Sequence, residues 1–568
     1  MHLLSWLALV FLGCAWLIPD HYLPWAAFQA DAVAAVAMAL LVAPVLVRAK
    51  RWCWPFLASV ALACVGVIAV QAFTGLILFA GDAWMAGLYM AGFGLSLAAG
   101  ATFESMGPRA SPWEALWLTF VFAGVLSVGA ELVQWLTVPD LGRWVTAMPP
   151  HGRPSGNLAQ PNQLATLLSL GFVGTLALHQ TGRLGGRCAW VVALWLVLGA
   201  VLTRSRTPWV AALMLTVWFV SFRARAEVRA RPAPLLVLLM LGVAMHFAVN
   251  PVSDALHLSD GRPLAEQAQG GTRPTHWAGM LDAASRKPWV GYGWNQVAVA
   301  QSRVATDHAS TWEQLEHSHN LLLDLLIWNG IPIGLGIFGS LAWWFASRWR
   351  RIRDPQSAYL IAAVGMVFLH SLLEFPLDYA YFLLPVGFMM GGLDERLRTT
   401  ARGTTVPRWV AVGLWAGCCC LGVMIGRDYL EAEQNLRTFR LEAARIGTGY
   451  VTSTAPDLLL LTQQSAFLSF ARHEAGPGMS AAELDDMHSI AQRFGYPPVL
   501  FRYAMASALN GRPEDARHSL ELLCVTQTQQ QCDEGRSAWI DTRDRRYPQL
   551  AAVSYPSTPA LGARLTKP

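Results

Sequence analysis

The amino-acid sequence predicts an all-α polytopic membrane protein of about 13 transmembrane helices with a small extracytoplasmic helical domain. Three observations support this. Of 568 residues, 54% are hydrophobic and 14% charged, a balance unlike that of a soluble enzyme. Apolar runs recur to about residue 425, many of them near the roughly 20 residues that cross a hydrocarbon core. Beyond residue 426 the composition becomes that of a soluble helical domain.

The apolar runs divide into thirteen predicted spans. The first lacks the basic n-region of a signal peptide, so we expect it to be retained. The spans cover about 3–18, 29–47, 55–73, 83–102, 113–133, 160–178, 188–203, 207–222, 234–250, 319–345, 357–373, 379–394 and 407–425.

The connecting loops indicate the orientation of the chain. Alternate loops carry basic clusters such as "RARAEVRAR" (223–231) and "RWRRIR" (348–353), whereas the other loops hold few basic residues. Basic loops face the cytoplasm. An odd number of spans then places the C-terminal tail outside, in the periplasm of a Gram-negative host, and the protein in the bacterial inner membrane.

Four segments follow from this pattern. Residues 1–250 hold the N-terminal transmembrane helices, 251–318 a large periplasmic loop, 319–425 the C-terminal transmembrane helices, and 426–568 a periplasmic helical tail. In the tail, Ser480 and Glu483 form a capping-box pattern. Two amphipathic runs around the Gly–Arg–Pro turn at 511–513 suggest a hairpin like a tetratricopeptide (TPR) unit.

Two cysteines, Cys524 and Cys532, lie in the tail, where oxidising conditions favour a disulfide. Two separate thiols are the alternative. The other seven cysteines lie in or beside spans, and we interpret them as small core residues.

Arginines on the outer face need a reason to be there. Arg153, Arg204, Arg206 and Arg273 all fall outside by this topology. The turn that holds Arg204 and Arg206 is only a few residues long, so both guanidiniums lie at the edge of the hydrocarbon, a costly position unless an anion meets them. They either snorkel to lipid phosphates or bind a phosphorylated substrate.

Polar residues also begin or end the spans on this face. In "QPNQ" (160–163), Pro161 suits a first helical turn, and Gln160, Asn162 and Gln163 either cap the helix or hydrogen-bond sugar hydroxyls or a diphosphate. Glu374, in otherwise apolar sequence, is a functional candidate or pairs with one of the arginines.

The motif "HSHN" (317–320) opens a leucine-rich span. Histidines two apart do not share a helix face, so they are not a helical metal pair. An extended segment would allow zinc with Glu313 or Glu316 as third ligand, but no further ligand set is evident, and we expect no metal. Asn320 as a cap beside an interfacial His319, or His319 as a catalytic group, both remain open.

Other chemistries lack their motifs in this sequence. It contains no P-loop, no dinucleotide fingerprint, no Gly-x-Ser-x-Gly elbow and no Cys-x-x-Cys pattern. We therefore expect no cofactor.

Together these motifs resemble the O-antigen ligase/polymerase superfamily (Wzy_C). In that superfamily, one span begins with His-Asn and reaches a glycine about ten residues later, and His319, Asn320 and Gly330 match this pattern. The next glycine, Gly334, comes one residue later than in the Gly-x-x-Gly of ligases. "LTRSRTPW" and "TRPTHWAGMLDAASRKPWVGYGWNQ" resemble its Ser-Arg and Arg…Gly-x-Gly elements. Within the superfamily, "RPSGNLAQPNQLATLL" and "HSLLEFPLDYAYFLLPVGFMMGG" resemble the PglL-type bacterial protein O-oligosaccharyltransferase branch.

The resemblance implies a GT-C-like glycosyltransferase that moves an oligosaccharide from undecaprenyl diphosphate to hydroxyls of an exported protein such as pilin. It implies catalytic roles for His319, Arg206 and Arg273. Positions that would bind substrate are Arg153, Arg204, Gln160, Asn162, Asn320, Glu374 and Tyr379. An O-antigen ligase acting on lipid A core, a polymerase, and a transporter of lipid-linked glycan are the alternatives. Charged residues at the outer edge of the spans favour an enzyme over a transport pathway.

Overall fold

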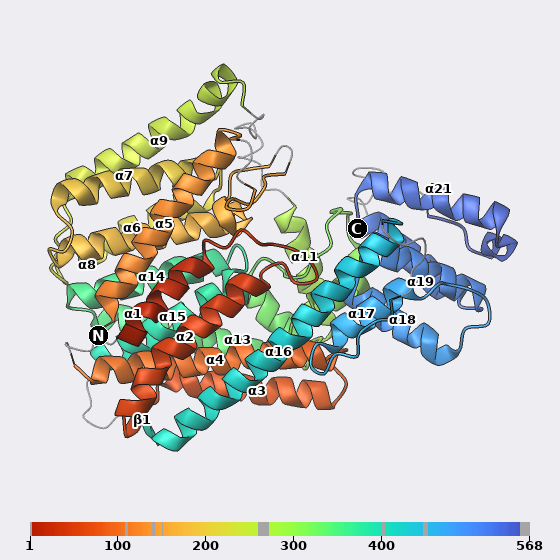
Figure 1. Ribbon diagram of the computed structural model, residues 1–568, viewed down its shortest axis with the longest axis horizontal. Helices are drawn as coiled ribbons and strands as arrows, with labels where there is room; N and C mark the ends of the chain where they lie inside the picture. Colours follow the sequence, from red (N-terminus) through yellow and green to blue (C-terminus); the bar gives the residue numbers. More distant parts are fainter. Residues whose placement is uncertain are drawn as a thin grey trace. The chain divides into compact units, whose positions relative to one another are not determined.

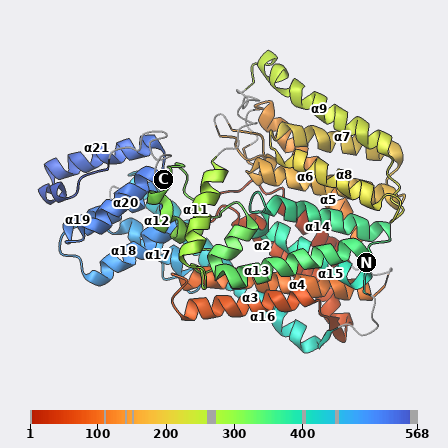
Figure 2. The same ribbon diagram turned by 180° about the vertical axis from the view of Figure 1, so that it is seen from behind.

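The computed structural model describes residues 3–107, 112–138, 142–149, 152–258, 272–398, 404–446 and 453–556, which are mostly helical (Figures 1 and 2). Each predicted span falls on one helix. These are α1 (Leu3–Ala15), α2 (Phe28–Arg48), α3 (Phe56–Phe73), α4 (Ala80–Ser105), α5 (Trp113–Trp135), α6 (Pro161–Gln180), α7 (Gly186–Leu202), α8 (Thr207–Phe222), α9 (Pro232–Ala255), α13 (Leu321–Arg351), α14 (Pro355–Ser371), α15 (Ala380–Arg396) and α16 (Arg408–Ala443).

Eight of these helices are long and apolar enough to cross a membrane, counted over the described residues. Three more, α1, α7 and α8, are apolar but shorter. The protein is thus a helical membrane protein, and the count of thirteen spans stays a prediction.

The helices form two compact units, which differ from the four segments expected from the sequence. The first holds 1–64, 88–269 and 339–423, and the second holds 65–87, 270–338 and 424–568. The second unit therefore joins parts of the chain that are remote in sequence. The bidentate pair between Arg493 and Asp82, with nitrogen–oxygen distances of 2.9 and 3.0 Å, is one such link.

In the first unit, helices pack in pairs around an apolar core. α6 contacts α5, α7 and α14, while α15 contacts α2 and α14. A small antiparallel ribbon pairs β1 (Arg51–Cys53) with β2 (Thr405–Pro407), a departure from the all-α expectation. The ribbon joins two loops that the arginine pattern assigns to the same face.

Ion pairs also connect loops of the basic set, to which the two loops of the β1–β2 ribbon belong. Arg396 contacts Glu104 at 2.6 Å and Asp354 at 3.0 Å, and Arg183 contacts Glu114 at 3.0 Å. All of these residues lie in or beside loops of the basic set. The structure therefore groups these loops together, as the alternation of basic loops requires.

The second unit contains the described part of the large loop and the helical tail. The loop forms α11 (Arg273–Arg286), α12 (Val297–Val304) and η3 (Ala305–Asp307), and the tail forms α17 (Thr462–Arg472), α18 (Ala481–Phe494), α19 (Pro497–Leu509), α20 (Pro513–Thr526), α21 (Gln529–Arg545) and η5 (Pro548–Ala552). The predicted capping box of Ser480 and Glu483 begins α18. The Gly–Arg–Pro turn separates α19 from α20, as expected.

The structure joins Cys524 to Cys532 by a disulfide, with the two Cα atoms 4.7 Å apart. Both side chains are buried between α20 and α21. We expect replacement of both by serine to lower the free energy of unfolding of the tail by about 2–3 kcal/mol, because the short closed loop no longer restricts the unfolded chain. Limited proteolysis of the full-length protein measures this.

The matched control is Cys188→Ser, which removes an exposed thiol on α7. This variant should digest like the parent, whereas the double serine variant should lose its tail faster. Free thiols at both Cys524 and Cys532 in non-reduced peptides, found by mass spectrometry, would contradict the disulfide.

Candidate active site

The predicted site residues divide between the two units. Arg153, Gln160, Asn162, Arg204, Arg206, Glu374 and Tyr379 belong to the first, and Arg273, His319 and Asn320 to the second. Each set is described by itself.

In the first unit, the loop before α6 is held by two buried amides. Gln134 Oε1 accepts from the backbone N–H groups of Ser155 and Gly156 at 2.8 and 2.9 Å. Asn157 Nδ2 donates to the carbonyls of Leu17 and Trp144. These bonds fix the backbone just after Arg153, which donates through Nη1 to the Arg204 carbonyl at 3.2 Å.

Arg204 and Arg206 have different surroundings although they share one turn. Arg204 is 5% exposed, has a φ of 49°, and donates through Nη2 to Ser253 Oγ at 3.0 Å. Burial lowers the pKa of its guanidinium, and Asp254 partly offsets this. Arg206 is exposed at the start of α8. This favours Arg204 as a group that holds the turn and Arg206 as the one that meets a ligand.

Asn162 connects three elements. Its Oδ1 accepts from Ser205 Oγ at 2.5 Å, and its Nδ2 donates to Glu374 Oε1 at 2.6 Å. The turn after α7, the start of α6 and the end of α14 are therefore linked through one amide. Asn162 makes none of the helix-capping bonds considered from the sequence; Pro161 does occupy the first turn of α6.

We expect Asn162→Asp to destabilise the protein by about 1–3 kcal/mol, because an oxygen would replace the donor that faces Glu374. Thermal unfolding of the purified protein measures this. Adding Glu374→Gln should restore stability, since the Gln amide can then donate to the new carboxylate. Equal stability of the single and double variants would contradict the role of this contact.

Gln160 is the N-cap of α6 by position but makes no side-chain cap bond. Its Oε1 is buried and accepts no hydrogen bond from the described residues. A buried acceptor without a donor is costly, so this oxygen suits a ligand hydroxyl or N–H better than it suits helix capping.

Tyr379 belongs to an aromatic stack at the start of α15. Its ring lies 6.0 Å from that of Phe375 and 5.1 Å from that of Tyr381. Tyr381 donates its hydroxyl to Gln163 Oε1 at 2.5 Å. Asp31 accepts from the Ala380 N–H at 2.7 Å and from the Tyr89 hydroxyl at 2.9 Å. The sequence reasoning missed Asp31, whose signal is a carboxylate within an apolar span.

In the second unit, His319 lies in a left-handed turn with a φ of 56°. Both flanking residues are fixed. The Ser318 N–H donates to Asp324 Oδ1 at 2.8 Å, and the Ser318 carbonyl accepts from Trp277 Nε1 at 3.0 Å. Asn320 Oδ1 accepts from the N–H groups of Leu322 and Leu323, which makes it a cap of α13.

Arg273 begins α11, one turn before a histidine that the sequence reasoning missed. His276 is 4% exposed and its Nε2 lies 3.4 Å from Glu313 Oε2. Burial lowers the pKa of His276, Glu313 opposes this, and His319 and Arg273 lower it further. The position of His276 in "RPTHW" was the available signal.

α13 is broken at Gly330, whose φ and ψ are 75° and 168°. A segment of the large loop fills the break. The Tyr292 N–H donates to the Ile327 carbonyl at 2.7 Å, and the Ile331 N–H donates to the Pro288 carbonyl at 2.7 Å. Gln71 Nε2 adds a bond to the Trp328 carbonyl at 2.9 Å. The helix headed by His319 and the loop that follows α11 are therefore locked by backbone bonds.

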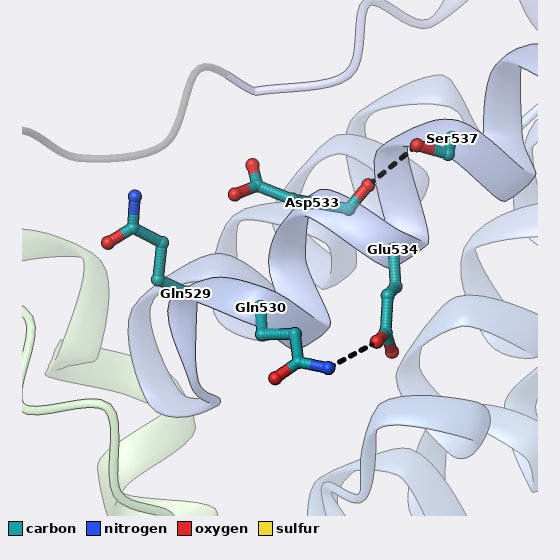
Figure 3. Close-up of a pocket in the computed structure, with 5 residues that line it drawn as sticks. All are labelled: Gln529, Gln530, Asp533, Glu534 and Ser537. Atoms are coloured by element: carbon teal, nitrogen blue, oxygen red, sulfur yellow. Dashed lines mark hydrogen bonds between the residues drawn. The ribbon is translucent and has the colours of Figure 1, made fainter.

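An open surface pocket of about 690 Å³ lies on α21 of the tail (Figure 3). It is lined by Gln529, Gln530, Asp533, Glu534 and Ser537. None of the predicted site residues lines it.

Comparisons with known proteins agree with these features. Residues 191–338 match the family described as "O-Antigen ligase", residues 154–179 match "Protein glycosylation ligase", and residues 358–526 match "Virulence factor membrane-bound polymerase, C-terminal". The first two matches cover the helix breaks and turns described above.

Two curated relatives come from Acinetobacter baylyi. The chain is 30% identical over 534 residues to its "General O-oligosaccharyltransferase", covering 92% of each chain. It is 26% identical over 361 residues to its "ComP-specific O-oligosaccharyltransferase", covering 63% of this chain and 65% of the relative. The chain therefore belongs to the PglL-type protein O-oligosaccharyltransferases of the O-antigen ligase superfamily, glycosyltransferases that attach O-linked glycans to proteins.

Proposed function

We propose that the enzyme transfers an oligosaccharide from undecaprenyl diphosphate to Ser or Thr hydroxyls of exported proteins such as pilin. The reaction takes place at the periplasmic face of the inner membrane. The turn of His319 is the observation that carries the proposal. A non-glycine residue with positive φ costs about 1–3 kcal/mol and persists where its surroundings enforce it, commonly at functional sites. Here Trp277, Asp324 and the cap of α13 enforce it.

In this proposal the acceptor hydroxyl oxygen attacks the anomeric carbon of the glycan. The bond from that carbon to the diphosphate oxygen breaks, and its electron pair stays with the diphosphate. His319 accepts the hydroxyl proton, as a general base does. Arg206 and Arg273 stabilise the charge that develops on the leaving diphosphate. Gln160, Asn162, Glu374 and Tyr379 position glycan or acceptor, and no metal takes part.

Purified protein with undecaprenyl-diphosphate-linked oligosaccharide and pilin tests the proposal. The expected result is pilin carrying the mass of the oligosaccharide on a Ser or Thr, also when EDTA is present. Residues 191–338 match the family described as "O-Antigen ligase", so a ligase that acts on lipid A core is the alternative. Offering lipid A core in place of pilin distinguishes that ligase from a protein O-oligosaccharyltransferase. Transfer to lipid A core alone would overturn the protein acceptor, and loss of transfer with EDTA would overturn metal independence.

Arg206→Lys should reduce transfer by about ten- to a hundredfold. A lysine keeps the charge but not the planar fork that binds two phosphate oxygens, and one charged hydrogen bond contributes about 1.5–3 kcal/mol. Initial rates at saturating acceptor measure this. Arg223→Lys, at the other end of α8, is the matched control. Equal rates for Arg206→Lys and the parent would exclude Arg206 from the diphosphate site.

A further inference from the structure

The loop segment Lys287–Gly293 lies against α13 well below its N-terminus. Besides the bonds to the Ile327 carbonyl and from Ile331, the Gly293 N–H donates to the Trp328 carbonyl at 3.1 Å. The loop therefore reaches the level of residues 327–331, six to ten residues along a helix that starts at Leu321.

The length of α13 locates this level in the membrane. The helix has 31 residues and ends in Arg348, Arg350 and Arg351. Counting the roughly 20 residues of a span back from Arg348 gives 328–347. With Arg348 at the inner limit, the outer limit of the hydrocarbon falls near Gly330, which is further along the chain than the start of the span 319–345 expected from the sequence.

Burial along α13 changes at the same point. Leu323, Leu325, Ile327 and Trp328, which precede the break, are buried by protein. Ile331, Ile333 and Leu335, which follow it, are exposed. Exposed apolar side chains on a membrane helix suit contact with lipid, so we expect the lipid-facing surface of α13 to begin after Gly330.

The loop presents two large apolar side chains at this level. Trp289 is 76% exposed and Val290 is 58% exposed. Lys287 beside them lies with its ammonium 4.8 Å from the ring centre of Tyr292. Tryptophan favours the interface between headgroups and hydrocarbon. Irregular backbone is tolerated at this depth when its polar groups are bonded, and here the Tyr292 and Gly293 N–H groups and the Pro288 carbonyl are bonded to α13.

We propose that Trp289 and Val290 form a membrane anchor that inserts the large loop into the outer leaflet, at the boundary between phospholipid headgroups and acyl chains. The anchor is separate from the groups assigned to glycan transfer. The molecules that Trp289 and Val290 contact are phospholipids. The anchor would hold α11, and with it Arg273, at a fixed height above the bilayer.

Photo-crosslinking of the full-length protein in its own membrane tests the anchor. p-Benzoylphenylalanine replaces Trp289 in one variant and Ile540, a 41%-exposed residue of α21 in the tail, in the control. After irradiation, peptides containing position 289 should carry phospholipid adducts at a yield at least several times that at position 540. Both positions are exposed, so both variants should fold and elute as the parent does.

Two outcomes would overturn the anchor. One is a lipid yield at 289 no higher than at 540. The other is a main adduct at 289 with a second copy of the chain or with a polyprenyl donor, since either would replace phospholipid as the occupant. A spin label at Val290→Cys, in a background whose seven free cysteines are replaced by alanine, gives a second measurement. Relaxation by oxygen should exceed relaxation by a water-soluble nickel complex, and the reverse order contradicts insertion.

Discussion

His319→Ala is expected to reduce glycan transfer to pilin by about 10²–10⁴-fold, the usual contribution of a general base. The effect should appear in the turnover rate at saturating donor and acceptor, because the side chain is proposed to act on the hydroxyl proton. Transfer rates of purified variants, followed by the mass of the pilin product, measure it.

Folding and catalysis are separated by two companion variants. His319→Asn keeps a residue that tolerates the φ of 56° but lacks the basic nitrogen, so it should fold like the parent and stay inactive. His317→Ala, two residues earlier, should retain most activity. Near-parental transfer by His319→Asn would exclude a base at this position.

Gly330→Ala is expected to lower the free energy of unfolding by about 2–6 kcal/mol and to abolish transfer. Its φ of 75° and ψ of 168° lie in a region essentially reserved for glycine, at a cost of about 1–3 kcal/mol for other residues. A Cβ atom there would also come within 2.5 Å of the Trp289 carbonyl group, and overpacking adds about 1–3 kcal/mol. The break in α13 and the loop that fills it must then separate.

Gly336→Ala is the matched control, because a Cβ atom at Gly336 on the same helix would meet nothing within 4 Å. It should unfold and react like the parent. Gly291→Ala should behave like Gly330→Ala, since its Cβ would lie 2.4 Å from the Ile327 carbonyl oxygen and 2.6 Å from the Gly330 nitrogen. Thermal unfolding and transfer are measured together. Parental stability and activity of both Gly291→Ala and Gly330→Ala would contradict the view that the loop after α11 is held tightly in the break of α13.

The positions of the long helices were predictable, because each membrane helix corresponds to a long apolar run in the sequence. Arginine content grouped the loops correctly in the first unit, as the β1–β2 ribbon and the pairs of Arg396 show. The two compact units were not predictable. They depend on contacts such as Arg493 with Asp82, whose partners are 411 residues apart and carry no local signal.

The candidate site divides in the same way. The motifs identified Asn162 and Glu374 separately, but their contact across 212 residues could not be read from either motif. Arg204 and Arg206 look equivalent in "TRSRT", and only the fold buries one and exposes the other. Gly334 lies one residue further from Gly330 than the Gly-x-x-Gly of ligases would place it. The structure gives a reason for a glycine at this position, because a Cβ at Gly334 would lie 2.6 Å from the Leu325 carbonyl oxygen. Both glycines meet backbone at the break.

The distance in sequence between Asp82 and Arg493 also determines when their contact can form during synthesis of the chain. Asp82 is 4% exposed in the finished protein, and the Arg493 guanidinium reaches it from α18. Synthesis at about 5–20 residues per second separates the two partners by about 20–80 seconds. During that interval the Asp82 carboxylate still lacks this arginine. The contact between Arg493 and Asp82 therefore forms only after α18 has been synthesised, so the second unit is completed late in the synthesis of the chain.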